Sequence, residues 1–479
     1  MNKAPPATFP DQTLLLPAQR FDANGRAHVD LRAVLALALP LVAGNAVQMV
    51  LNLTDVWFIG HISTLALAGV AAVQWLVLVV VMILGGIGMA VQTVVSQNFG
   101  ARRRARASQA AWIGLWGTLG VTPLFVLAGL GGRWMLEPFG FDPKIATLAD
   151  AFWMPRVAGS CFGVAAWSLI GFFNGIGRPH VTLIITAVTA ITNIALNQLF
   201  IFDLDWGVAG SGWATTVAQA LSLIVGVGYL LSAKYRQEYK SHLTWRLHVP
   251  RLWQQFRLGF PMGLLYAADL IGVAIFQMMQ VRLGTADGAA TQLVMMLTSV
   301  AYMPGFGIAI AGTTLVGQSI GAGDKQWAMR VGTTVTWIAA AYMGGAGILL
   351  ALAGPWILPL FTVAQDAEAA AMVVLGTQIL WLAAVYQFFD GMNLGSGLCL
   401  RGAGDAFVPA ALVLALSWLL FVPLAHSLTF APGQGWFDFL PQFGWGAVGG
   451  WTALVVYIFL LGITLFLRWR SGAWQRIRI

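Results

Sequence analysis

Long apolar runs separated by short polar segments recur along this chain from residue 33 to residue 467. An α-helix needs about 20 residues to cross the hydrocarbon core of a membrane, and each run is near that length. The pattern therefore predicts an all-α polytopic membrane protein. We place twelve transmembrane helices at 33–58, 64–92, 110–131, 150–173, 181–202, 208–232, 257–281, 290–314, 331–353, 371–399, 408–427 and 446–467.

Composition and charge agree with this prediction. Hydrophobic residues make up 58% of the chain and charged residues 9%, against about 25% charged in a soluble domain. The net charge of +8 could suggest nucleic acid. With the N-terminus inside and twelve crossings, however, all Lys and Arg residues fall on the inner side except Arg133, Lys144, Arg156 and Arg282. By the positive-inside rule both termini are cytoplasmic, and "ARRRARAS" (101–108) is expected to anchor at anionic membrane lipids, with no nucleic-acid partner.

The two halves of the chain repeat each other. Residues of the loop after the second helix recur at one constant offset after the eighth helix, as the pairs Gln97 and Gln318, Gly100 and Gly321, Ala101 and Ala322, and Ala107 and Ala328. A second match aligns "FFNGIGRPH" with "CLRGAGDAF", and so Gly175 with Gly402. An even number of crossings separates the halves, which predicts a parallel repeat of two six-helix bundles around a central cleft.

The repeat also sets the expected domain boundaries. They are an N-terminal cytoplasmic arm at 1–32, a first bundle at 33–233, a cytoplasmic linker at 234–256, a second bundle at 257–468 and a cytoplasmic tail at 469–479. The arm is polar and contains proline, so it is not expected to be a cleaved signal peptide.

Two prolines occupy matching places in the halves. The offset of the repeated loops maps Pro40 onto Pro261. Proline interrupts the helical hydrogen-bond ladder, so both are hinge candidates.

Three acidic residues, Asp55, Asp269 and Asp390, stand inside the predicted helices. A charged carboxylate at mid-membrane costs about 2.5–3.5 kcal/mol, so each is a functional candidate. Asp269 and Asp390 lie at nearly equal distances from the inner ends of their helices, and Tyr386 precedes Asp390 by one helical turn. Two carboxylates at one depth can converge on one cation.

At this point the chain resembles a known family. "LALALPLVAGNAVQMVLNLTDVWFIG", "GFPMGLLYAAD", "YQFFDGMNLGSGLCLRGAGDAFVP" and the duplicated loop are similar to those of the multidrug and toxic compound extrusion (MATE) family, in its NorM-like branch. The resemblance extends from about Arg32 to Arg468. It implies a cation-coupled antiporter, not an enzyme, that exports lipophilic and often cationic compounds by alternating access. A monomer in a bacterial-type inner membrane without a cofactor is expected.

The resemblance also implies roles for particular residues. Asp269, Asp390 and Tyr386 fall on a Na⁺ or H⁺ site of the second half, although the NorM-like pattern has Glu where this chain has the shorter Asp269. In the first half, Asp55, Asn193, Asn197 and Thr215 correspond to a proton, cation or substrate site. Other branches have Asp at the position of Asn197, so Asp55 is the one titratable group expected there. Interhelical hydrogen bonding would explain the two amides equally well.

Three other classes of protein are alternatives. A flippase of the same superfamily for lipid or polysaccharide precursors would favour a strongly cationic cavity, whereas the charges within the predicted helices are all acidic. A major facilitator transporter usually has an Asp in the basic loop that "FGARRRARAS" lacks. An intramembrane enzyme would need a cluster of catalytic side chains near a membrane boundary, and the histidines are scattered.

Overall fold

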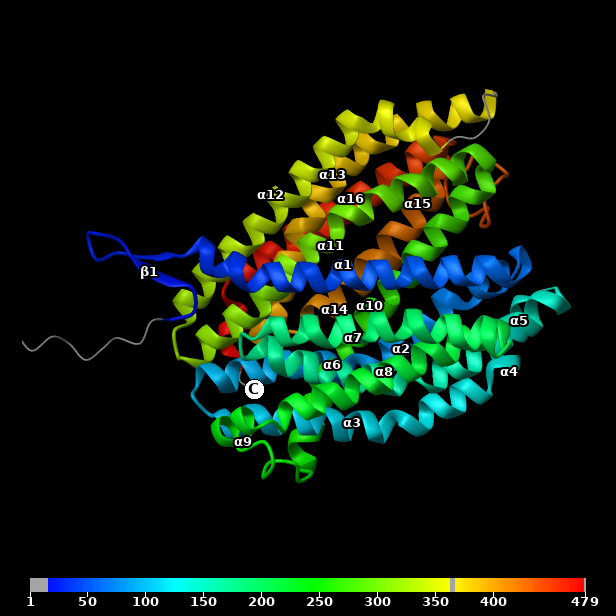
Figure 1. Ribbon diagram of the computed structural model, residues 1–479. Coiled ribbons are helices and arrows are strands. Elements are labelled where there is room, and N and C mark those ends of the chain that lie inside the picture. The colour runs from blue at the N-terminus through cyan, green and yellow to red at the C-terminus, as the bar shows by residue number, and fades with distance from the viewer. Residues whose placement is uncertain (1–15, 141, 362–366, 478–479) are drawn as a thin grey trace, which may run out of the picture.

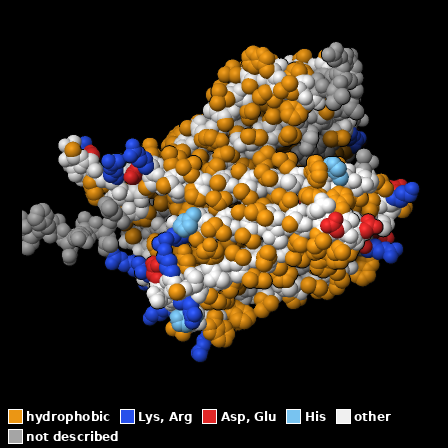
Figure 2. Space-filling model, viewed as in Figure 1, with side chains coloured by type: hydrophobic (Ala, Val, Ile, Leu, Met, Phe, Trp, Pro, Cys, Tyr) orange, Lys and Arg blue, Asp and Glu red, His pale blue; other side chains and the backbone are white. Residues whose placement is uncertain are grey.

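The structure is a computed structural model that describes residues 16–140, 142–361 and 367–477. Within these ranges, twelve helical segments are long and apolar enough to cross a membrane, which confirms the predicted number. They run side by side in one molecule whose middle is covered by hydrophobic side chains, while Lys and Arg gather mainly at one end (Figure 2). We call this end, where β1, α9 and the C-terminus lie (Figure 1), the basic end.

The first half contains a two-stranded β-hairpin and six membrane-spanning segments. Its elements are β1 (Gln19–Phe21), β2 (Ala27–Val29), α1 (Leu31–Ile62), α2 (Thr64–Gly100), α3 (Arg104–Leu130), α4 (Gly132–Leu136), α5 (Pro143–Ala158), α6 (Ser160–Gly175), α7 (Pro179–Asn197), the π-helix η2 (Gln198–Asp203), α8 (Gly207–Leu230) and α9 (Ala233–Tyr239). α5 and α6 together make one span, and so do α7 and η2.

The second half repeats this arrangement. Its elements are α10 (Val249–Leu283), α11 (Thr285–Gly321), α12 (Lys325–Ile357), α13 (Ala367–Ala403), α14 (Phe407–Ala415), the π-helix η4 (Leu416–Phe421), α15 (Val422–Thr429) and α16 (Gly446–Arg470). The fifth span of each half therefore contains a π-helical stretch, a feature that is frequent at functional sites.

The helix boundaries differ from the expected ones mainly at the basic end. α3 begins at Arg104 and α10 at Val249, so α10 starts inside the expected linker. Both first turns are basic, and a hydrophobic window misses such turns. Side-chain caps are easier to read from the sequence: Asp30, Ser63 and Asp324 each accept a hydrogen bond from a first-turn amide of α1, α2 and α12.

The arm before α1 contains structure that the sequence pattern did not predict. β1 and β2 pair antiparallel around a short turn. Trp327 of α12 donates its indole N–H to the carbonyl of Pro17 at 2.9 Å, which ties the hairpin to the second half.

The two halves cross where glycines allow close approach. A Cβ on Gly86 of α2 would lie 2.3 Å from the carbonyl oxygen of Gly259 on α10, and a Cβ on Gly307 of α11 would lie 2.8 Å from the side chain of Val42 on α1. These crossings are equivalent in the repeat. Each lies beside a hinge candidate, because Val42 follows Pro40 by two residues and Gly259 precedes Pro261 by two. Each hinge candidate therefore lies where one half packs against the other.

Near the basic end the halves are joined by a symmetric set of hydrogen bonds, which we call the interlobe latch. The Gln97 amide donates to the Gly402 carbonyl at 3.0 Å, and the Gln318 amide donates to the Gly175 carbonyl at 2.8 Å. The matching threonines add two bonds, from Thr93 to the Arg401 carbonyl at 2.9 Å and from Thr314 to the Asn174 carbonyl at 3.0 Å.

The latch explains the sequence repeat. The accepting carbonyls lie in the last turns of α6 and α13, where intrahelical donors run out. Each glutamine of one half satisfies a carbonyl that the repeat places in the other. The glycines also permit the approach, because a Cβ on Gly100 would lie 2.0 Å from the Gln318 carbonyl oxygen, and one on Gly321 equally close to that of Gln97.

Candidate functional site

A cavity of about 120 Å³ in the second half, the C-lobe cavity, brings together the three residues expected there. Asp269 is contributed by α10, and Tyr386 and Asp390 by α13. The expected convergence of the two carboxylates on one place is therefore seen in the structure.

The partners of these carboxylates include two residues that the sequence did not single out. Tyr457 of α16 donates its hydroxyl to Asp269 Oδ1 at 3.1 Å. The Asn393 amide donates to Asp390 Oδ1 at 3.1 Å. Asn393 follows Asp390 by three residues in the "YQFFDGMN" segment, so helical spacing could have predicted that the two lie together. No feature of the sequence near Tyr457 indicates that it contacts Asp269.

Asp390 has room for one more partner. Its side chain is only 3% exposed, yet its Oδ2 makes no hydrogen bond within 3.5 Å to the described residues, although the Tyr386 hydroxyl lies near enough to interact with this carboxylate. A buried acceptor without a partner is costly. A proton or a cation bound at Oδ2 would remove that cost.

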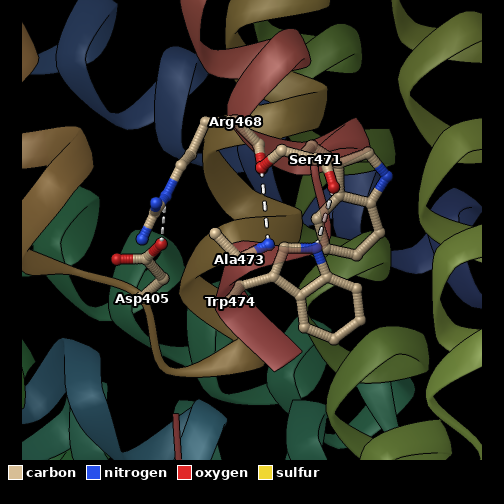
Figure 3. Close-up of polar contacts among 6 residues, drawn as sticks. Asp405, Arg468, Ser471, Ala473 and Trp474 are labelled. Carbon is tan, nitrogen blue, oxygen red and sulfur yellow. Dashed lines mark hydrogen bonds and ion pairs between the residues drawn. The ribbon is translucent and has the colours of Figure 1, made fainter. Parts of the chain in front are cut away.

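Another acid in the same cavity, Asp405, is already neutralised. Arg468 of α16 donates its Nε–H to Asp405 Oδ2 at 2.9 Å (Figure 3). In the turn after α16, the Trp474 indole N–H donates to the Trp469 carbonyl at 2.9 Å. Asp405 therefore joins helix ends at the basic end and is a weaker candidate for ion binding.

A cavity of about 400 Å³ in the first half, the N-lobe cavity, is lined by residues of α1, α2, α5, α7 and α8, among them Asp55 and Thr215. A hydrogen-bond chain runs through the four expected residues. The Asn197 amide donates to Asp55 Oδ1 at 2.6 Å and to Asn193 Oδ1 at 3.0 Å, and the Asn193 amide donates to the Thr215 hydroxyl at 3.0 Å. η2 begins directly after Asn197.

Comparison with known proteins now identifies the family. The MatE family model matches residues 40–199 and 261–426, one segment in each half. The chain belongs to the MatE family. A "Probable multidrug resistance protein NorM" of Agrobacterium fabrum is 25% identical over 418 residues, covering 85% of this chain and 90% of the relative. A protein of the same description from Pseudomonas syringae pv. tomato is 28% identical, with 92% and 95% covered.

Solved structures share the fold. One, described as "Outward-facing conformation of a multidrug resistance MATE family transporter of the MOP superfamily", has a TM-score of 0.81 at 18% identity and covers 93% of this chain and 96% of that chain. Another, "Crystal structure of MATE in the bent conformation", has a TM-score of 0.79 at 18% identity, with 92% and 96% covered. The fold and the resemblance to the NorM-like branch are thereby confirmed.

One expectation about this MatE chain was wrong. The charges inside the membrane-spanning helices are not all acidic, because Arg156 of α5 lines the N-lobe cavity and Arg401 of α13 lines the C-lobe cavity. A hydrophobic pattern does not predict this, because it cannot tell how far a helix continues past its apolar run. Arg401 donates to the carbonyl of Met89 in the other half.

Arg156 is the more consequential of the two. Its guanidinium donates to the Ser160 hydroxyl at 3.1 Å, and within the described ranges no carboxylate lies within the 4.0 Å of an ion pair. Arg156 nevertheless lines the same N-lobe cavity as Asp55. The cavity thus holds one negative and one positive group that do not touch.

The donor atoms of the C-lobe cavity suit a hard cation. Carboxylate, phenol and amide oxygens favour such ions over transition metals. In the part of the chain that the structure describes, no group of three or more His, Cys, Asp or Glu could hold a metal. Cys161 and Cys399 are both buried and free.

Proposed function

We propose that this MatE-family protein exports lipophilic, often cationic compounds across a bacterial inner membrane in exchange for Na⁺ or H⁺. The observation that carries the proposal is Asp390, a buried carboxylate in a membrane-spanning helix with one oxygen free to bind. An unneutralised acid at this depth is tolerated where function requires it. The multidrug-resistance descriptions of the bacterial relatives support the export of drugs.

The basic end would face the cytoplasm, as the positive-inside rule requires. The interlobe latch would then close the inner side of the protein, so this conformation would be closed toward the cytoplasm. In this state a coupling ion would arrive from the outside. Release of the ion to the inside would need the latch to open.

In the C-lobe cavity, the coupling ion would bind between Asp390 and Asp269, with the Tyr386 hydroxyl as a further oxygen. The Tyr457 hydroxyl holds Asp269 in place. Asp269 is one methylene shorter than the Glu of the NorM-like pattern, so its carboxylate extends less far from α10. The hydrogen bond from Tyr457 restrains the position of this carboxylate.

In the N-lobe cavity, a proton on Asp55 would change the sign of the local charge. With Asp55 ionised, the charges of Asp55 and Arg156 cancel. With Asp55 protonated, Arg156 leaves the cavity positive, which repels a cationic compound. At an effective dielectric of about 20, a unit charge at 4 Å contributes about 4 kcal/mol, so Arg156 beyond that distance contributes less.

The energy source follows from the net charge moved. Each net charge that moves inward gains about 2.3 kcal/mol per 100 mV of membrane potential. Exchange of one cation for one monovalent drug is electrically neutral, so the potential drives export only when more positive charge enters than leaves. Two separate cavities that each contain aspartate would give this protein room for two coupling ions.

Transport of a fluorescent lipophilic cation into inverted vesicles tests the proposal, with a Na⁺ gradient and a pH gradient applied separately. Asp55→Asn, Asp269→Asn and Asp390→Asn are compared with Asp438→Asn, a change in the loop between α15 and α16. We expect Asp390→Asn to abolish transport driven by one of the gradients and Asp438→Asn to retain it. Full coupled transport by Asp390→Asn would refute the proposal.

The flippase alternative predicts a different cavity. A carrier of a pyrophosphate-linked lipid would need a strongly cationic one, whereas each cavity here combines arginine with aspartate. Export of a lipophilic cation agrees better with that balance.

A further inference from the structure

We propose that a pocket at the basic end, between α3 and α10, binds a phosphate group, either that of an anionic phospholipid or free phosphate. The pocket has a volume of about 310 Å³. We call it the arginine pocket, and its polar lining includes Arg103, Arg106, Arg251, Gln254 and Gln255. It lies outside the N-lobe and C-lobe cavities.

The charge of the arginine pocket is uncompensated. Its lining contains three arginines and no Asp or Glu. Among the described residues, ion pairs within 4.0 Å join Arg104 to Glu238 and Arg468 to Asp405, and none involves these three arginines. The charges of Arg106 and Arg251 act on each other, and this repulsion would be relieved by an anion between them.

The early residues of two helices line the arginine pocket. α3 begins directly after Arg103, and α10 begins two residues before Arg251. Neither helix has a side-chain cap or an acidic residue in its first turn. The positive dipole end of a helix stabilises an anion beside it, phosphate above all.

Gln255 gives independent support. Its side chain is 2% exposed and lines the arginine pocket, yet its Nε2 has no hydrogen-bond partner in the part of the chain that is described. Buried donors are nearly always satisfied, and an unsatisfied one calls for an explanation. A phosphate oxygen in the pocket would accept this hydrogen bond.

The position suggests what binding would do. Arg103 and Arg106 belong to the first half, and Arg251 belongs to the first helix of the second. Gln97 and Gly321 of the latch region line the same pocket. A phosphate held there would bridge the halves beside the interlobe latch and favour its closed state. The basic end is also where anionic headgroups would be found if it faces the cytoplasm.

The test uses the full chain purified in detergent, with dioleoyl phosphatidylglycerol, dioleoyl phosphatidylcholine and inorganic phosphate as separate probes. Lipid binding is measured by native mass spectrometry, and phosphate binding by the shift in thermal unfolding temperature. Arg106→Gln and Arg251→Gln are the test variants. Arg330→Gln, an exposed arginine at the same end of the molecule and outside the pocket, is the matched control.

We expect phosphatidylglycerol to bind in preference to phosphatidylcholine. Each test variant should bind it about fivefold more weakly, since one basic residue near the surface contributes about 1 kcal/mol, and Arg330→Gln should not. Stabilisation by millimolar inorganic phosphate, lost in the test variants, would assign the site to free phosphate. Equal loss in all three variants, or binding of neither probe, would overturn the proposal. The unfolding temperature without probe shows that each variant is folded.

Discussion

Removal of the two latch glutamines should open the basic end of the molecule. Gln97→Ala and Gln318→Ala each delete one hydrogen bond between the halves and leave a carbonyl at the end of α6 or α13 without its donor. Opening breaks both bonds in the native protein. Their removal therefore destabilises the closed state and leaves the open state, where water can reach the carbonyls, nearly unchanged.

The expected size follows from the number of bonds. A hydrogen bond contributes about 1 kcal/mol in a water-soluble protein and about 0.6 kcal/mol on average between membrane helices. Each single variant should thus shift the open-to-closed ratio about three- to fivefold. The double variant loses roughly 1.2–2 kcal/mol by the same estimates, which corresponds to a shift of about eight- to thirtyfold.

Double electron–electron resonance on the full chain measures this shift. Spin labels at Lys234→Cys and Arg330→Cys, both exposed and in different halves, report the separation of the halves at the basic end. Both native cysteines are buried. Asn98→Ala is the matched control, because the Asn98 amide binds the carbonyl of Val94 in its own helix at 2.8 Å.

The symmetry of the latch makes the prediction strict. The two single variants should lengthen the label distance to a similar extent, and the double variant should exceed both. Asn98→Ala should behave as the native chain. A large effect of one glutamine with none of the other, or no effect of the double variant, would refute the reasoning.

Three further changes test other contacts. Gly100→Ala should keep the latch open, because its Cβ would lie 2.0 Å from the Gln318 carbonyl oxygen, and the same spin labels would show it. Tyr457→Phe removes the hydrogen-bond donor to Asp269 Oδ1, and we expect the coupling ion to bind roughly 1 kcal/mol more weakly. Half-maximal transport should then need about a fivefold higher ion concentration, with little change in drug affinity. Arg156→Gln should tighten the binding of a monovalent cationic drug and slow its release, which would be measured as a lower dissociation constant and a lower transport rate. An unchanged dissociation constant would contradict the role given to Arg156.

Much of the architecture could be predicted from the sequence. Crossing a membrane requires apolar runs of a certain length, and that requirement reveals the twelve segments directly. The recurring Gln97 and Gln318 also carried structural information, since each binds a carbonyl contributed by the other repeated motif. The pairing itself could not be predicted, because a repeat in the sequence does not say whether equivalent residues contact their own half or the opposite one.

The surroundings of the acids were less predictable. Asp55 and Asp390 stood out because a carboxylate is costly inside a membrane. Tyr457 and Arg156 did not, since a tyrosine among apolar residues is common and an arginine near a helix end is usually placed at the surface. Their importance arises from packing between distant helices. The β1–β2 hairpin was missed for another reason, because strands of three residues have no periodicity to detect.

The halves match where they hold each other and differ in the cavities that we propose as binding sites. The offset that relates Gln97 to Gln318 also relates Gln48, which lines the N-lobe cavity, to Asp269 in the C-lobe cavity. The interlobe latch constrains both halves equally. If the glutamine of one half changes, a carbonyl of the other half loses its hydrogen-bond donor. No such constraint links the two cavities. One copy could therefore keep a neutral amide beside Asp55 and Arg156 while the other acquired a second carboxylate beside Asp390, so that one symmetric latch joins two cavities of different charge.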